Sequence, residues 1–162
     1  MQKNVLICVL LLYSISCLST NKKFQKLEKE NENIGILYLM RRYSPLLALF
    51  DFDIEIYQYK GHFKNHNKIK IYELELKPGE FAIFYLQEGF YEIIFPYFSH
   101  YNHIFYITKK QVLFKNIEIY SKSFFSLPDI IITDLTKEKA VEYLLESGGM
   151  FQNQSINGTT KN

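Results

Sequence analysis

The sequence lacks the short motifs that mark the common enzyme classes. It contains no G-x-S-x-G, no P-loop and no Rossmann glycine pattern. Its charge is nearly balanced: the 162 residues have a formal net charge of +2, and no stretch combines dense Lys and Arg with phosphate-cradling glycines. We therefore expect no catalytic residues, no cofactor and no nucleic acid partner.

Cysteine is nearly absent, and no apolar run is long enough for a transmembrane helix. A spanning helix needs about 20 apolar residues, whereas the run that begins at Val5 weakens at Tyr13 and has ended by Ser19. The two cysteines are Cys8, inside this run, and Cys17, at its polar end. If the chain is cut just before Cys17, the mature protein keeps one cysteine and cannot form an internal disulfide.

The N-terminus has the three parts of a secretory signal. Lys3 supplies a positive charge, residues 5–12 form an apolar stretch, and residues 14–16 are Ser, Ile and Ser. This pattern predicts a signal peptide over residues 1–16.

The four residues that end at Cys17 resemble a loose bacterial lipobox, with Ser14 in place of the usual leucine and a small residue, Ser16, just before the cysteine. The resemblance implies cleavage by signal peptidase II and a Cys17 sulfur that carries diacylglycerol, so that a lipid holds the protein at a membrane. An ordinary secretory leader, cut after Ser16 or Ser19, is the alternative.

Two further segments are polar. From Leu18 to Asn33 the chain is charged and poor in apolar residues, which is typical of a flexible tether. With the lipidated cysteine this segment spans residues 17–33. After Phe151 the chain has almost no apolar residues, so we expect residues 148–162 to be a disordered tail. The folded domain is then predicted to span residues 34–147.

Residues 34–133 have the pattern of short strands. "DFDIEIYQY" alternates apolar and polar residues, and "FAIFYL" is apolar on both faces, as in a central strand. "IKIYELEL" changes its apolar phase between Ile71 and Tyr72, which indicates a bulge, and Lys77-Pro78-Gly79 predicts a turn. The spacing of strands and turns indicates a mainly β protein, an antiparallel β-sandwich of about seven to eight strands.

One C-terminal helix is expected to close the domain. Thr136 fits the N-cap position, and Gly148-Gly149 should end the helix. Leu135 and Ala140 can form a hydrophobic staple, and the apolar stripe consists of Val141, Leu144 and Leu145.

Several segments, in order, resemble small bacterial lipoproteins that bear domain of unknown function 2846: "ILYLMRR", "DIEIYQYKG", "LKPGEFAIFYLQEGFYEI", "HIFYIT" and "LTKEKAVEYLL". Tyr38 and Arg41 match the Tyr-x-x-Arg of the family's first strand, and Gly89 matches a glycine turn before an aromatic residue. The chain departs from the family in lacking proline after Arg41 and in a long segment at 121–128. The resemblance implies export, a lipid anchor and a β-sandwich, and supplies no catalytic residues.

Four histidines could form a zinc site if they converged: His62, His66, His100 and His103. In an up-and-down strand order, the first two and the last two lie at opposite ends of the sandwich. HxxxH spacing also loses its geometric meaning outside a helix. We therefore interpret them as solvated loop residues and expect no metal site.

Acidic and basic residues offer two further candidate sites. Asp51, Asp53 and Glu55 share one face of a strand, where alternate residues lie about 6.6 Å apart. This is close to the roughly 6.5–9.5 Å between the carboxyl groups of an inverting glycosidase. No pattern indicates a pocket that would raise one pKa, so a solvated sheet face is the preferred interpretation. Arg41 and Arg42 either pair with a buried carboxylate or remain exposed edge charges.

The preferred hypothesis is a non-enzymatic protein of the bacterial cell envelope, anchored by lipid at Cys17. Its β-sandwich would bind an envelope protein partner or serve as envelope structure. Two alternatives stay open: a secreted hydrolase or metal-dependent enzyme that uses the histidines or the acidic strand, and a plain secreted protein of an AT-rich eukaryote. In a eukaryote, Asn153-Gln-Ser and Asn157-Gly-Thr would be glycan acceptors.

Overall fold

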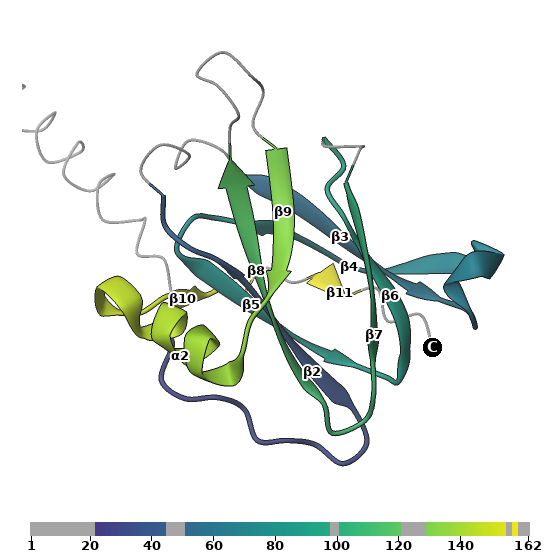
Figure 1. The fold of residues 1–162 in the computed structure, drawn as a ribbon, viewed down its shortest axis with the longest axis horizontal. Coiled ribbons are helices and arrows are strands. Elements are labelled where there is room, and N and C mark those ends of the chain that lie inside the picture. Colours follow the sequence, from purple (N-terminus) through teal and green to yellow (C-terminus); the bar gives the residue numbers. More distant parts are fainter. Residues whose placement is uncertain (1–21, 45–50, 98–100, 121–128, 155–156, 159–162) are drawn as a thin grey trace, which may run out of the picture.

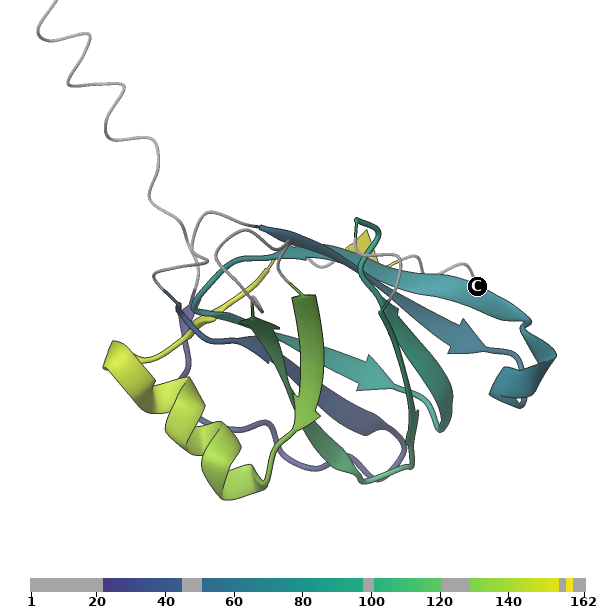
Figure 2. The same ribbon diagram turned by 45° about the horizontal axis from the view of Figure 1, so that its top comes forward.

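The computed structural model describes residues 22–44, 51–97, 101–120, 129–154 and 157–158. These residues form two β-sheets that pack face to face, and one α-helix covers the outer side of the first sheet (Figures 1 and 2). The predicted mainly β sandwich with a C-terminal helix is confirmed.

Eight strands of six to nine residues make up the body of the sandwich. They are β2 (Gly35–Arg41), β3 (Phe52–Tyr59), β4 (Lys68–Leu76), β5 (Glu80–Leu86), β6 (Gly89–Ile94), β7 (Asn102–Ile107), β8 (Val112–Tyr120) and β9 (Asp129–Asp134). Three strands of two residues complete the sheets: β1 (Lys22–Lys23), β10 (Phe151–Gln152) and β11 (Asn157–Gly158). The helical elements are α2 (Lys137–Leu145) and the short turns η2 (Phe63–Asn65) and η3 (Glu146–Gly148).

The strand order differs from a simple up-and-down arrangement. The first sheet has the order β1-β10-β5-β2-β8-β9, and the second β11-β4-β3-β6-β7. Most pairings are antiparallel, as predicted, but β2 pairs with β8 in parallel, and so does β10 with β5. A parallel pair needs a long connection, and between β2 and β8 the chain forms β5 and most of the second sheet. All seven residues of β2 are buried.

The bulge and the turn predicted around β4 are both present. Ile56 of β3 pairs with Tyr72, and the next residue, Tyr57, pairs with Lys70, so Ile71 is the extra residue. At the β4–β5 turn, Gly79 has a φ of 81°, a conformation that glycine adopts without steric cost.

Two apolar cores hold the layers together. One lies between the sheets and includes Leu37, Ile54, Phe84, Ile93 and Ile117. The other lies on the outer side of the first sheet, where Ala140 and Leu144 of α2 pack against Tyr38, Phe81 and Phe114. The helix begins as predicted, since the Thr136 side chain accepts a hydrogen bond from Lys139 N. The predicted apolar stripe is wrong at Leu145, which is 56% exposed.

The predicted flexible tether is wrong from Lys22 onward. β1 pairs with β10, and Phe24 N donates a hydrogen bond to Met150 O at 2.8 Å. The Phe24 ring meets Phe81 edge to face, and Leu27 packs against the outer core. Two apolar side chains and backbone pairing are thus enough to fix this polar segment along the first sheet.

The predicted disordered tail is also wrong for the residues that the structure describes there. Met150 is buried, β10 pairs with β5, and β11 pairs with β4. Asn153 Nδ2 donates hydrogen bonds to Glu75 O at 2.6 Å and to Glu80 Oε2 at 2.8 Å. Because this amide is 5% exposed, it is not accessible to a glycan in the folded protein.

No helix in the described part of the chain has the length and apolar character needed to cross a membrane.

Candidate functional site

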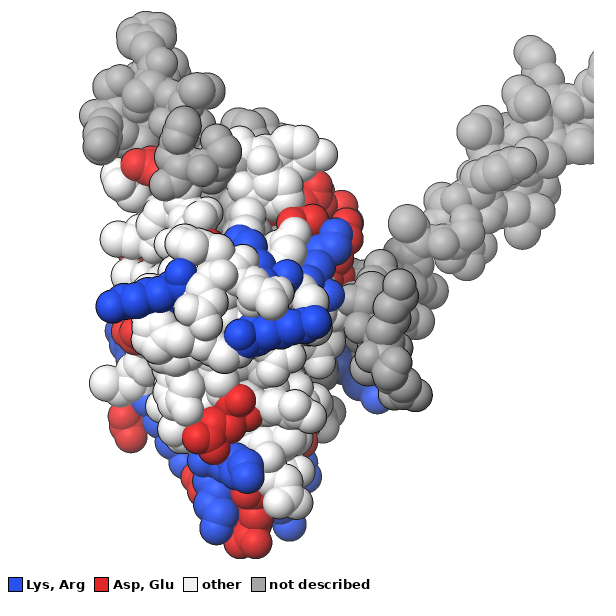
Figure 3. Space-filling model, turned by 90° about the vertical axis from the view of Figure 1, so that its right-hand side faces the viewer, with Lys and Arg blue, Asp and Glu red and all other residues white. Residues whose placement is uncertain are grey.

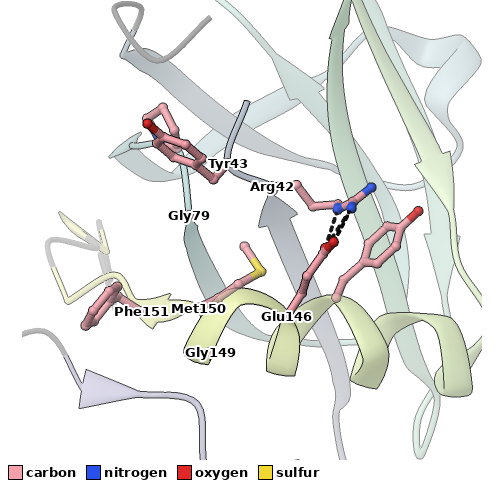
Figure 4. A pocket seen from close by; sticks show the side chains of 9 residues that line it. Arg42, Tyr43, Gly79, Glu146, Gly149, Met150 and Phe151 are labelled. Atoms are coloured by element: carbon pink, nitrogen blue, oxygen red, sulfur yellow. Dashed lines mark hydrogen bonds and ion pairs between the residues drawn. The ribbon is translucent and has the colours of Figure 1, made fainter. Parts of the chain in front are cut away.

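A pocket of about 350 Å³ lies where the end of β2, the β4–β5 turn, the end of α2 and β10 meet (Figure 4). These elements lie far apart in the sequence, and the pairing of β5 with both β2 and β10 brings them together. The pocket is lined by Arg42, Tyr43, Pro78, Gly79, Tyr143, Glu146, Gly149, Met150 and Phe151.

Arg42 forms the polar side of this pocket. Its Nε and Nη2 donate hydrogen bonds to the two carboxylate oxygens of Glu146 at 2.8 and 2.7 Å (Figure 4). Its guanidinium carbon lies 4.1 Å from the centre of the Tyr143 ring. The two charged side chains are 42% and 46% exposed, so the pair contributes little to stability. Its main effect is to hold the guanidinium in one orientation at the pocket wall.

Arg41 has a different environment, although it is adjacent in sequence. It is 2% exposed, lies with its guanidinium carbon 4.3 Å from the Phe52 ring centre, and donates a hydrogen bond to Leu76 O at 2.8 Å. Burial lowers the pKa of Arg41 to about 10, against the opposing charges of Asp51 and Glu80. Arg41 therefore joins the two sheets, and the prediction of an exposed edge charge is wrong for it.

The lining of the pocket is mainly apolar and aromatic. Its nine lining residues include no Ser, Thr, Cys or His, so nucleophile–base pairs built from these residues do not occur in it. Its one carboxylate, Glu146, is paired with Arg42. Aromatic rings, a methionine and an oriented ion pair provide apolar contact and hydrogen bonding instead.

The structure does not bring together the histidines that it describes. His62 and His66 flank η2, and His62 contacts Phe90 near the start of β6. His103 lies in β7 and pairs with Ile93 near the end of β6. The two parts of the group are therefore separated by the length of β6. His100 lies outside the described residues. Among the described residues there is no group of three or more His, Cys, Asp or Glu side chains that could hold a metal ion.

His103 is a half-buried strand residue in a polar cluster with Lys115 and Asp134, which contradicts the prediction of a solvated loop residue. Lys115 Nζ lies 2.9 Å from His103 Nε2 and also donates a hydrogen bond to Asp134. The Lys115 side chain is 3% exposed and lies over the Phe105 ring. Because an ammonium group only donates, His103 must be neutral at Nε2. The cluster joins β7 of the second sheet to β8 and β9 of the first.

We expect the stability of the protein to fall below about pH 6.5 because of His103. Burial, then the charge of Lys115, lower the pKa of His103, and Asp134 opposes this effect only in part. As pH falls, the unfolded chain therefore binds a proton before the folded protein does, and the free energy of unfolding decreases. Melting temperatures measured between pH 8 and 5.5 should show this loss.

The matched variants for this test are His103→Gln and His66→Asn. The first should flatten the pH dependence, and the second should retain it, since asparagine tolerates the left-handed backbone at His66. Equal slopes in both variants would contradict the assignment.

In the acidic strand, Glu55 is held as a paired carboxylate. Asp51 precedes β3, and Glu55 Oε1 lies 3.0 Å from Lys70 Nζ. Burial alone would raise the pKa of Glu55, but hydrogen bonds from Lys70 and Tyr57 outweigh it and hold the pKa below its ordinary value. An acid catalyst needs the opposite shift.

Glu92, in β6, was not identified from the sequence. It is 2% exposed and accepts hydrogen bonds from Tyr59 Oη at 2.7 Å and from Lys68 Nζ at 2.6 Å. Burial and the bond to Glu92 raise the pKa of Tyr59 to about 12. This carboxylate links three strands of the second sheet.

A group of four aromatic side chains, not identified from the sequence, lies at the η2 end of the second sheet: His62, Phe63, Phe90 and Tyr106. Successive ring centres lie 4.5 to 5.3 Å apart, and Tyr106 is 43% exposed. The available signal was the presence of Phe90 and Tyr106 in two predicted strands. These two residues pair across β6 and β7, and a pattern within one strand does not show which residues of η2 they contact. On the side of the molecule seen in Figure 3, acidic and basic side chains are interspersed with uncharged ones.

Cys17 and Cys8 lie outside the residues that the structure describes. Comparisons of the chain with protein-family models, with curated proteins and with solved structures find no match. The resemblance to lipoproteins bearing domain of unknown function 2846 therefore stays a prediction.

Proposed function

We propose that this protein is anchored by a lipid on Cys17 in a bacterial cell envelope and that its β-sandwich binds a partner without catalysing a reaction. The observation that carries the proposal is the position of Cys17. This cysteine stands at the end of a signal-like leader, and Lys22 begins the first described strand five residues later. Cleavage before Cys17 would leave one cysteine in the exported chain. Acylation of its sulfur would explain why this cysteine is present and would leave no reactive thiol exposed.

The non-catalytic part of the proposal is supported by what the candidate catalytic groups contact. Glu55 is paired with Lys70, and His103 accepts a hydrogen bond from Lys115. Both groups are thus bound in contacts between strands. The pocket beside Arg42 offers aromatic and polar contacts for a ligand, and its lining includes no Ser, Thr, Cys or His, which favours a binding role for an envelope protein partner.

Labelling with palmitate in a bacterial host tests the anchor. The wild-type full-length chain should incorporate labelled palmitate and enter the detergent phase on phase separation, because diacylglycerol gives two chains and a single chain binds only marginally. Cys17→Ala should abolish the labelling. Cys8→Ala is the matched control, since Cys8 lies within the leader, and it should still be labelled.

The proposal fails if the wild-type protein takes up no fatty acid and its mature N-terminus is Thr20. That result would identify an ordinary secretory leader.

A further inference from the structure

We propose that the surface around the Arg42 pocket rests against the membrane and contacts anionic lipid headgroups. This surface consists of β1, β10, the pocket rim and the end of α2. The inference rests on the proposed acylation of Cys17 and goes beyond it by assigning the face of the sandwich that meets the bilayer.

The first argument is the length of chain between the anchor and the folded body. Cys17 and Lys22 are five residues apart, and β1 begins at Lys22. Five fully extended residues span at most about 18 Å, whatever path the intervening chain takes. A lipid on Cys17 therefore keeps the edge formed by β1 and β10 close to the bilayer surface.

The second argument is the chemistry of that edge. Phe151 is 41% exposed, Tyr43 is 65% exposed, and both line the pocket. Leu145, which precedes the lining residue Glu146, is 56% exposed. Aromatic and aliphatic side chains of this kind enter the headgroup region of a membrane.

Basic side chains stand beside this apolar group. Lys22 and Lys23 are exposed in β1, and Lys23 Nζ lies 5.5 Å from the centre of the Phe151 ring. Lysines next to a membrane surface are attracted to anionic lipids. Their position beside Phe151 places positive charge where a headgroup phosphate would lie.

The arrangement of the sandwich leaves its other end free. β10 and α2 lie at one end of the molecule, and the β3–β4 hairpin with η2 lies at the opposite end (Figures 1 and 2). With β1 at the membrane, the aromatic group of His62, Phe63, Phe90 and Tyr106 faces away from it.

The absence of tryptophan from the chain allows a direct test with single-tryptophan variants. Phe151→Trp and Tyr106→Trp replace aromatic residues of nearly equal exposure, 41% and 43%, at opposite ends. The full-length acylated protein is purified and incorporated into vesicles of phosphatidylglycerol and phosphatidylethanolamine with brominated acyl chains. Phe151→Trp should lose about half of its fluorescence, because interfacial side chains reach the boundary between headgroups and acyl chains. Tyr106→Trp should be unaffected.

Charge reversal gives a second measurement on the same samples. In the Phe151→Trp background, Lys22→Glu with Lys23→Glu should reduce the quenching. The same charge change at Lys109 and Lys110, which are exposed in the β7–β8 turn, should not. If Phe151→Trp does not fold, Tyr43→Trp tests the same surface, because Tyr43 also lines the pocket but lies outside the strands.

The outcomes separate this inference from the proposed anchor. If wild-type protein does not float with vesicles, the anchor proposal fails. If the protein floats but neither tryptophan is quenched, or both are quenched equally, the anchor stands and the membrane-facing surface is wrong.

Discussion

Leu144→Asp is expected to lower the melting temperature by 10 °C or more, on the order expected for a loss of several kcal/mol in a domain of this size. Leu144 is fully buried between α2 and the first sheet, where it packs with Tyr38 and Phe114. A carboxylate at this position has no partner and must be desolvated, and an unpaired buried charge costs several kcal/mol. That cost is a large part of the roughly 5–15 kcal/mol that stabilises a typical domain.

Leu145→Asp is the matched control for this variant, because it makes the same change one residue later in the same helix. Leu145 is 56% exposed, so the melting temperature of the Leu145→Asp protein should stay within about a degree or two of that of the wild type. Circular dichroism during heating measures both variants. Equal losses would contradict the packing of α2 described above.

The strands and the helix could be predicted because their signals are local. Alternation in β3, the phase change at Ile71 and the N-cap at Thr136 each depend on residues within one element. Proline and glycine at the β4–β5 turn act in the same way. Such signals identify a strand or a helix but do not show which other strand or helix it pairs with. For this reason the parallel pairing of β2 with β8 could not be predicted.

The fixed N-terminal segment and tail were missed for a related reason. β1 pairs with β10 and β10 with β5, so each segment is held by a part of the chain far away in sequence. A segment with two apolar residues among many charged ones has the composition of a tether. Its order comes from the outer core that Phe24 and Leu27 help to complete.

The candidate site could be predicted only in part. Arg41 and Arg42 were identified as candidates for pairing with a carboxylate, but the sequence could not distinguish the buried residue from the exposed one. Arg42 meets Glu146 across 104 positions of the chain. Likewise, His103 meets Lys115 because β7 of one sheet faces β8 of the other. Contacts between sheets depend on topology, which single-strand patterns do not contain.

The second large effect is expected at Gly35, the first residue of β2. A Cβ atom there would lie 2.5 Å from Cγ1 of Ile107 and 2.8 Å from the backbone oxygen of Thr108. The two sheets approach each other closely at this point, which is one reason for a glycine inside a strand. Gly35→Ala should destabilise the protein by about 1–3 kcal/mol or more, as overpacking does in a closely packed interior.

A double-mutant cycle with Ile107→Ala tests this steric explanation. Ile107 is fully buried, so Ile107→Ala alone should cost about 2–5 kcal/mol. In that background Gly35→Ala should cost less, because the two closest side-chain atoms are gone, although the Thr108 oxygen still crowds the new methyl group. Denaturant unfolding of the four proteins gives the coupling energy. If Gly35→Ala costs the same in both backgrounds, the contact with Ile107 is not the reason that β2 begins with glycine.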